Sequence, residues 1–339
     1  MTRRVGSPGW APRPRSSPEP VTGNVTGSGD ERTLGDDPMV VGLLGRCTFP
    51  PAGAPLVCAV SGGPDSTALL ALAVAAGCRV TAVHVDHGLR AGSAAEADVV
   101  AAAADRLGSA FRTVRIVVPD GPNLEARARA ARHDAVGPGA ATGHTMDDQA
   151  ETVLGNLLRG SGVHGLAGMR AGPTHPLLGL RRRETVALCA HLGLSTVRDP
   201  SNDDPRFVRN RVRSELLPLC ADIAGRDVVP VLARQAALLA GDADLLDDAA
   251  AAVDPTDAAA LTAAPAALAR RAVRRWLAAG GPYPPPADAV DRVLDVARLE
   301  RRATEVPGGM RVTRSGGRLA RVPPAGHGPR GVAGTPVQS

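Results

Sequence analysis

Strand-like and helix-like segments alternate from Leu56 to about residue 160, and this alternation constrains the fold more than any other feature of the chain. Short apolar runs such as LVCAV and RVTAVHV end in polar or glycine-rich turns, and alanine-rich stretches such as STALLALAVAA follow them. Strands that alternate with helices in this way pair in parallel and are covered by helices on both faces. We therefore expect an α/β fold with a doubly wound parallel sheet, whose ligands bind at the carboxyl ends of the strands.

The composition changes at both ends of this region. Residues 1–38 are rich in Pro, Gly, Ser and Arg without apolar periodicity, so we expect a disordered arm, and we expect a disordered tail at 324–339. Between them we place an α/β domain at 39–222. Residues 223–323 predict a smaller, mainly helical domain that ends in a short hairpin. Met39, where the apolar pattern begins, is an alternative start to Met1.

Composition also excludes several kinds of chemistry. All 39 basic residues are arginine, so the chain has no lysine for Schiff-base chemistry or for a Walker-type phosphate loop. The five cysteines stand singly without a C-x-x-C pair, which argues against zinc and iron–sulfur sites and indicates a reduced, cytoplasmic protein. No apolar run approaches the ~20 residues that span a bilayer, so we expect no membrane partner. The net charge of +5 suits a polyanionic partner, although many such proteins bind no nucleic acid.

A glycine-rich loop follows the first predicted strand, with the sequence Ser61-Gly62-Gly63-Pro64-Asp65-Ser66. Its glycines let successive backbone N–H groups point at one spot, and the helix that follows adds its positive end, so the loop predicts a phosphate site. We expect Asp65 to be an exposed carboxylate that holds Mg²⁺, because it would otherwise repel the phosphate. An ordinary turn with Ser66 as the helix cap is the alternative.

Two further groups of polar residues fall at strand ends or helix starts. His84 and His87 lie at the carboxyl end of the second strand, where a histidine can contact phosphate or nucleotide. Asp148 and Glu151 are three residues apart at a helix start, so their carboxylates share one face and can hold a cation. Ordinary stabilisation of the helix dipole is the alternative for acidic residues at this place.

In their order along the chain, these segments resemble the tRNA(Ile)-lysidine synthase family of the N-type ATP pyrophosphatases. SGGPDS is similar to the pyrophosphate loop of that superfamily, and the segment from His84 to Arg90 resembles a His-x-x-His-Gly-Leu signature. The longest match runs from Gly143 to Gly162 and contains GHTMDDQAET. An Asn-x-Glu-x-x-Ala-Arg-x-x-Arg element starts at Asn123, and Arg-Asn-x-Val-Arg ends the matched region at Arg213.

The resemblance implies an adenine nucleotide α-hydrolase-like fold and an ATP-dependent ligase, with the catalytic domain at 39–222 and a domain that binds the tRNA substrate at 223–323. Its reaction would attach free L-lysine to C2 of the wobble cytidine in the CAU anticodon of tRNA(Ile), through an adenylated tRNA. The products would be lysidine, AMP and pyrophosphate, and decoding would change from AUG to AUA. ATP would be a substrate with Mg²⁺ as cofactor, and a homodimer is left open.

The implied site residues fall into three groups. ATP and pyrophosphate would be bound by Ser61, Gly62, Gly63, Pro64, Asp65, Ser66, His84, His87, Gly143 and His144. Asp148 and Glu151 would bind lysine and would share the catalytic role with Asp65, which would also be the metal ligand. The tRNA would be contacted by Arg129, Arg132, Arg209, Arg211 and Arg213, with a solvated cluster as the alternative.

A further group of arginines lies beyond the matched region. Arg270, Arg271, Arg274 and Arg275 recur in a helical segment at a spacing that groups them on one face. An unpaired cationic face favours a polyanion, so we predict that Arg271 and Arg275 contact tRNA. A solvated face in an arginine-rich protein is the alternative.

The chain departs from the family pattern at two positions. His133 stands where the family usually has tyrosine, and Thr196 stands near the place of a frequent tryptophan.

A tRNA cytidine thiolase of the same superfamily is the alternative enzyme, but such enzymes carry cysteine pairs that this chain lacks. A module that binds ATP without chemistry would explain the loop and the sheet, but not the DDQAET segment.

Overall fold

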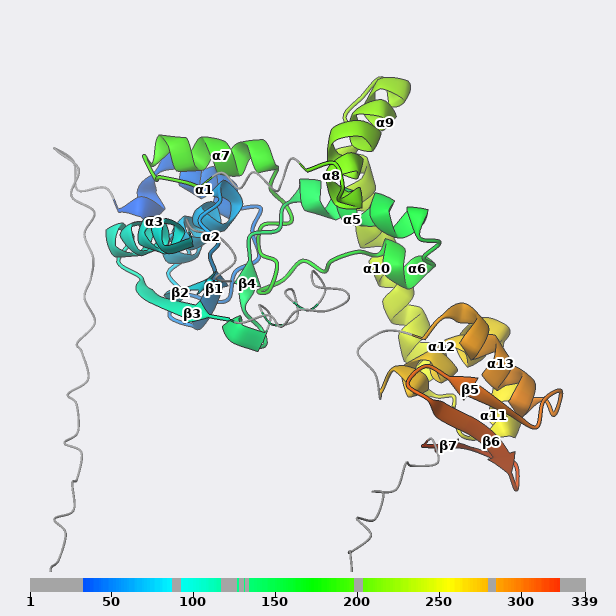
Figure 1. Ribbon diagram of the computed structural model, residues 1–339. Helices are drawn as coiled ribbons and strands as arrows, with labels where there is room; N and C mark the ends of the chain where they lie inside the picture. The colour runs from blue at the N-terminus through cyan, green and yellow to red at the C-terminus, as the bar shows by residue number, and fades with distance from the viewer. Residues whose placement is uncertain are drawn as a thin grey trace, which may run out of the picture. The chain divides into compact units, whose positions relative to one another are not determined.

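The computed structural model describes residues 33–86, 93–116, 127, 131, 134–197, 204–279 and 285–323 (Figure 1). The described residues form two compact units. One unit draws on Met1–Glu151 and Met169–Pro230, and the other draws on Thr152–Gly168 and Val231–Ser339. The helix predicted from Asn123 lies mostly outside the described residues, as do His87, Arg129, Arg132 and His133.

The first unit is built on a parallel sheet with the strand order β3-β2-β1-β4. Its strands are β1 (Pro55–Ala59), β2 (Arg79–Asp86), β3 (Ala110–Arg115) and β4 (Ala141–Thr142). Cys58 of β1 pairs with Ala82 of β2 on one side and with Ala141 of β4 on the other. The direction of strand addition therefore reverses between β1 and β4, which makes their carboxyl ends the ligand-binding edge of a doubly wound sheet. The predicted fold class is confirmed.

Helices of the first unit cover this sheet and bury its centre. They are α1 (Pro38–Leu44), α2 (Pro64–Ala75), α3 (Ser93–Arg106) and α7 (Arg182–His191), after a 3-10 turn at Leu34–Asp36. Helix α2 is apolar on all sides, and Leu69, Leu70 and Leu72 are fully buried between the sheet and α7. A fully buried helix directly after the glycine-rich loop gives that loop a rigid base.

Residues 33–38, which we assigned to the predicted disordered arm, belong to the folded part of the chain. Residues 33–38 are folded, because Leu34 packs against the core and the Asp37 side chain caps α1 by accepting hydrogen bonds from the backbone N–H groups of Met39 and Val40. The residues of the arm before Thr33 lie outside the described residues.

Short helices connect the sheet to the rest of the chain. They are α5 (Met146–Leu158), α6 (Val163–Leu166), α8 (Val208–Arg211), a π-helical turn (Val212–Leu216) and α9 (Leu217–Ala224). The amino-terminal turns of α5, together with α8 and the π-helical turn, belong to the first unit. These are the elements that bear the predicted carboxylates and the arginines from Arg209 to Arg213.

The second unit packs helices against a small antiparallel sheet. Its elements are α10 (Val229–Ala251), whose first two residues belong to the first unit, α11 (Ala258–Ala263), α12 (Ala266–Ala278), α13 (Ala287–Ala297), β5 (Ala303–Val306), β6 (Met310–Ser315) and β7 (Arg318–Val322). Val290, Val293, Leu294 and Ala297 repeat at helical spacing and are buried against Val312.

The hairpin predicted near the end of the chain is present as β6 and β7. Gly316 and Gly317 both have positive φ, 55° and 78°, as a two-residue turn between twisted strands requires. Strand β5, which pairs with β6, was missed, because four residues give too short an alternation to recognise.

Candidate active site

The glycine-rich loop joins β1 to α2 at the ligand-binding edge. Gly62 has a φ of +87°, and a Cβ there would lie 3.2 Å from the Val197 side chain, so glycine is required on both grounds. The Ser66 hydroxyl accepts from the Ser61 N–H at 3.2 Å and donates to the Gly63 carbonyl at 2.9 Å. Ser66 therefore closes the loop on itself, and its proton is already used within the protein.

Asp65 is half-buried in the first turn of α2, and the expectation of an exposed loop carboxylate is wrong. Thr185 donates its hydroxyl to Asp65, and Arg182 donates Nε to the other carboxylate oxygen at 3.2 Å. Both partners belong to α7, which packs on α2. Burial raises the pKa of Asp65, and the contacts with Thr185 and Arg182 oppose that rise.

The β4–α5 loop is held against the glycine-rich loop by Gly143. A Cβ at Gly143 would lie 2.6 Å from the Asp65 carbonyl oxygen, so only glycine permits this approach. The next residue, His144, forms a 2.7 Å hydrogen bond between its Nδ1 and the Thr142 hydroxyl. The carboxyl ends of β1 and β4 are thus brought together, as the strand order requires.

His84 is buried beneath this edge, with 2% of its surface exposed. Its Nδ1 lies 2.9 Å from the Val60 carbonyl, which can only accept, so we assign the ring proton to Nδ1. Within the described part of the chain, Nε2 has no hydrogen-bond partner. His84 therefore holds a buried hydrogen-bond acceptor at Nε2 that no described group satisfies.

Asp148 is fixed at the start of α5. One of its carboxylate oxygens accepts hydrogen bonds from the Thr145 N–H and hydroxyl, both at 2.8 Å, in the manner of a capping box. Burial by itself would raise the pKa of Asp148, but Arg182 and Arg209 hold it below its ordinary value.

Glu151 lies one turn further along α5 and is 2% exposed. Burial would raise its pKa too, but the hydrogen bonds from Arg213 and the charges of Arg182 and Arg209 lower it. Asp148 and Glu151 thus share one helix face, as the sequence predicts, and both are ionised.

Three arginines from separate elements surround this carboxylate pair. Arg182 donates to Asp148 at 2.7 Å and to Glu151 at 3.0 Å. Arg209 donates to the same two carboxylates at 2.8 Å each, and Arg213 donates to Glu151 at 2.7 and 3.1 Å. The arginines that we predicted to face tRNA at 209 and 213 therefore lie in the carboxylate cluster.

Arg211 points elsewhere, because it forms an exposed ion pair with Glu215. Sequence reasoning missed Arg182 and Thr185 as site residues. The signal available was the run Arg181-Arg182-Arg183-Glu184 after an apolar segment, but this run does not show which arginine turns inward.

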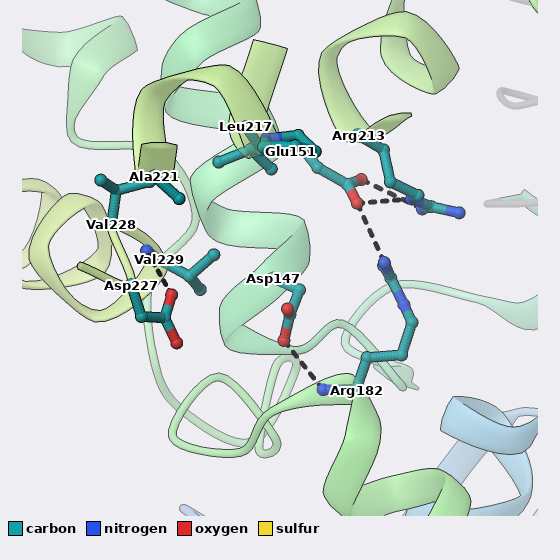
Figure 2. Close-up of a pocket in the computed structure, with 10 residues that line it drawn as sticks. Asp147, Glu151, Arg182, Arg213, Leu217, Ala221, Asp227, Val228 and Val229 are labelled. Carbon is teal, nitrogen blue, oxygen red and sulfur yellow. Dashed lines mark hydrogen bonds and ion pairs between the residues drawn. The ribbon is translucent and has the colours of Figure 1, made fainter. Parts of the chain in front are cut away.

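A cavity of about 210 Å³ opens beside the cluster (Figure 2). Charged side chains line it together with apolar side chains from α9 and from residues 228–229, where α10 begins, and Asp227 lies beside the apolar ones. The charged residues are Asp147, Glu151, Arg182, Arg213 and Asp227, and the others are Leu217, Pro218, Ala221, Val228 and Val229. Such a cavity suits a ligand that has an aliphatic chain and charged ends.

The described residues hold no cluster of three or more His, Cys, Asp or Glu side chains that would form a metal site by themselves. Mg²⁺ usually takes one or two protein carboxylates and completes its shell with water and substrate phosphates. Asp65, beside a phosphate-type loop, fits that pattern as a single ligand.

The arginines of α12 in the second unit are paired, so the expectation of an unpaired cationic face is wrong. Arg271 forms a 2.6 Å ion pair with Asp247, and Arg275 donates to the Asp247 backbone carbonyl at 3.1 Å. The other two are also bonded, Arg270 to Asp291 and Arg274 to the Pro285 carbonyl.

Comparison with known proteins agrees with this geometry. Residues 47–220 match the family model of the PP-loop domain, so the first unit belongs to the PP-loop class of ATP-binding enzymes. Residues 257–320 match the TilS substrate binding domain.

In the described residues, no helix has the length and apolar character needed to cross a membrane.

Relatives over most of the chain define the family more closely. A tRNA(Ile)-lysidine synthase of Nocardia farcinica is 46% identical over 254 residues, which cover 69% of this chain and 79% of the relative. One from Mycolicibacterium paratuberculosis is 49% identical over 240 residues, or 66% and 74% of the two chains. The chain belongs to the tRNA(Ile)-lysidine synthase family and is a ligase that forms a carbon–nitrogen bond. A U34-tRNA thiolase from Methanococcus maripaludis aligns structurally over 60% of this chain and 77% of its own, with 17% identity and a TM-score of 0.45.

Proposed function

We propose that this enzyme attaches free L-lysine to C2 of the wobble cytidine in the CAU anticodon of tRNA(Ile), at the expense of ATP. One observation carries the proposal. Arg182 joins Asp65 of the phosphate-type loop to the Asp148 and Glu151 carboxylates, so a nucleotide site and a cation site form a single site. Membership of the lysidine synthase family supports this assignment.

The first step is adenylation of the tRNA. The C2 oxygen of cytidine attacks the α-phosphorus of ATP, an oxygen–phosphorus bond forms, and the bond to pyrophosphate breaks. Backbone N–H groups of residues 61–63 and the positive end of α2 stabilise the pyrophosphate charge. Bound Mg²⁺, with Asp65 as its protein ligand, would neutralise further charge on the phosphates. His84 would accept a hydrogen bond from the nucleoside part of ATP.

The second step is attack by lysine. Its ε-amine forms a bond to C2, the bond from C2 to the oxygen of AMP breaks, and the proton of the amine passes to solvent. Asp148 and Glu151 have lowered pKa values, so they are weak bases and suit the binding and orientation of the ammonium group better than proton removal. The aliphatic part of lysine would lie along Leu217, Ala221 and Val229 in the adjoining cavity.

The tRNA carries the cytidine to this edge. An RNA partner agrees with the net charge of +5 and with the match of residues 257–320 to a substrate binding domain. Arg211, whose side chain is 61% exposed, is the better placed of the predicted tRNA contacts in the first unit, because Arg209 and Arg213 are engaged with carboxylates.

Incubation with ATP, radiolabelled lysine and unmodified tRNA tests the proposal. We expect covalent label in tRNA(Ile) with a CAU anticodon, and release of pyrophosphate that depends on this tRNA. Equal labelling of tRNA(Met), which has the same anticodon, would contradict the proposed specificity. Absence of label from both tRNAs would contradict the reaction.

A further inference from the structure

The carboxylates proposed to bind lysine have no free oxygen in this structure. Asp148 uses one oxygen for the Thr145 N–H and hydroxyl and the other for Arg182 and Arg209. Glu151 accepts from Arg182 and Arg213 at one oxygen and from Arg209 and Arg213 at the other. Two donors at each oxygen leave no place for an ammonium group. Lysine must displace an arginine in order to bind there.

Arg182 differs from the other two arginines in its reach. It contacts Asp65 at 3.2 Å as well as Asp148 and Glu151, whereas Arg209 contacts only the last two among these carboxylates. Arg182 is thus the guanidinium that links the nucleotide loop to the lysine carboxylates. Its backbone N–H is anchored on Asp147 at 2.8 Å, so its side chain can change partners about a fixed base.

A nucleotide in the loop changes the partners that Arg182 is offered. The cation that accompanies the triphosphate competes for Asp65, and the phosphate oxygens provide new acceptors for a guanidinium. Both effects favour the breaking of two hydrogen bonds of Arg182, from Nη2 to Asp148 and from Nη1 to Glu151. These two bonds join the same pair of carboxylates that the lysine ammonium requires.

We propose that Arg182 is an internal cation that occupies the lysine carboxylates until ATP binds, so that lysine binds after the nucleotide. This inference rests on the proposed function. Arg182 is then a positioning residue that couples the two substrate sites. Coupling of this kind is reciprocal, so lysine raises the affinity for nucleotide by the same factor as nucleotide raises the affinity for lysine.

Equilibrium dialysis of radiolabelled lysine against the full chain measures this coupling directly. The dissociation constant is compared with and without Mg²⁺ and an ATP analogue whose α,β-bridge cannot be cleaved. For the wild type we expect lysine to bind at least ~10-fold more tightly with the analogue, within the usual range of coupling between sites. For Arg182→Gln we expect tighter binding of lysine in the absence of analogue. The ratio of the lysine dissociation constants without and with analogue should fall below ~2-fold. A wild-type ratio in Arg182→Gln would overturn the proposal.

Arg209→Gln is the matched control, because Arg209 bridges the same two carboxylates without touching Asp65. It should change both lysine dissociation constants and leave their ratio as in the wild type. Collapse of the ratio in Arg209→Gln as well would show that loss of any arginine from the cluster abolishes coupling, and would overturn the assignment of the coupling to Arg182. Arg182→Lys keeps an internal cation and should restore at least part of the ratio.

Two further measurements keep the test decisive. Thermal melting shows whether Arg182→Gln is folded. If this variant is unfolded, the affinity of the wild type for the analogue is measured instead by titration, with and without lysine. That titration must give the same factor as the lysine experiment, and a factor of one would overturn the proposal. If wild type labels tRNA but binds lysine equally in both conditions, the inference fails alone. If wild type neither binds lysine nor labels tRNA, the proposed function fails as well.

Discussion

At the scale of single residues, the site is defined by an exact balance of charge between three carboxylates and three guanidinium groups. Asp65, Asp148 and Glu151 are buried or half-buried, and each accepts at least one hydrogen bond from Arg182. Burial of such groups is tolerated only while the partners remain together, since an unpaired buried charge is strongly destabilising. Substitution of one member therefore affects stability and function to different degrees.

Asp65→Asn separates these two effects. The raised pKa of Asp65 shows that burial disfavours its charge, so removal of the charge should change the free energy of unfolding by no more than about 1 kcal/mol. Pyrophosphate release should fall by at least ~100-fold, because the carboxylate proposed to hold Mg²⁺ is lost. Assays of pyrophosphate release and urea denaturation of the same preparation check both parts, and near-normal turnover would contradict the assigned role.

Glu151→Gln should have the opposite effect to Asp65→Asn, because it should lower the stability and largely preserve adenylation. Loss of this charge leaves Arg213 without its close ionic partner and Arg209 with Asp148 alone, and because both arginines are partly exposed we expect a loss of about 2 kcal/mol in unfolding free energy. The requirement for lysine should rise while adenylation is largely preserved. Equal loss of adenylation would show that the carboxylate pair serves ATP instead.

Acid unfolding provides an independent check on the same carboxylates. The pKa of Glu151 is lowered from an ordinary value of 4.5, so its stabilising contribution is complete above that pH and is lost as the pH falls through the lowered value. Asp148 behaves in the same way below 3.8. Urea midpoints between about pH 7 and about pH 3 should therefore fall more steeply for the wild type than for Glu151→Gln.

At the scale of elements, the site depends on the close approach of two strand ends. Gly143 after β4 contacts the backbone of Asp65 in α2, so the loop that leads into α5 is held beside the phosphate-type loop. This contact places the carboxylates of α5 next to the proposed nucleotide site. The approach requires a residue without a side chain.

Gly143→Ala tests this requirement. A Cβ at 2.6 Å from a carbonyl oxygen forces the two loops apart, and we expect a loss of about 1–3 kcal/mol in stability together with loss of pyrophosphate release. Gly42→Ala is the matched control, because no atom lies within 4 Å of a Cβ at that helical position. The control should be neutral or slightly stabilising, and equal effects of both substitutions would contradict the account.

Local sequence signals predicted the elements but not their meeting points. The parallel sheet, the glycine-rich loop and the shared face of Asp148 and Glu151 all follow from periodicity and spacing within a few residues. Arg182 could not be assigned in this way, because it lies 117 residues from Asp65 and 34 from Asp148, and only the packing of α7 on α2 brings them together. The pairing of Arg271 with Asp247 was missed for the same reason.

At the scale of the whole molecule, two units divide the work of the proposed reaction. The first unit contains the phosphate-type loop, the carboxylate cluster and the cavity, and the second matches a substrate binding domain. In the second unit, Arg302 and Arg311 are exposed and have no ion-pair partner among the described residues, whereas Arg271 is paired. The unpaired arginines are the better candidates for phosphate contacts.

Substitution of both Arg302 and Arg311 by Gln should therefore weaken tRNA binding. Each phosphate contact removed flattens the dependence of log affinity on log salt by about 0.7 to 0.9, so the double variant should lose up to about twice that slope. Replacement of Arg271 and Arg275 by Gln should have a smaller effect on the slope, and ATP binding should be unchanged in both. A larger effect of the Arg271 and Arg275 variant would restore α12 as the tRNA contact.

Mass spectrometry of the wobble nucleoside is the sharpest test of lysine transfer to C2. After reaction of tRNA(Ile) with ATP and lysine, we predict cytidine that has gained one lysine and lost one water, with one AMP and one pyrophosphate released for each nucleoside converted. An unchanged cytidine despite release of pyrophosphate, or a nucleoside in which sulfur has replaced the C2 oxygen, would contradict it.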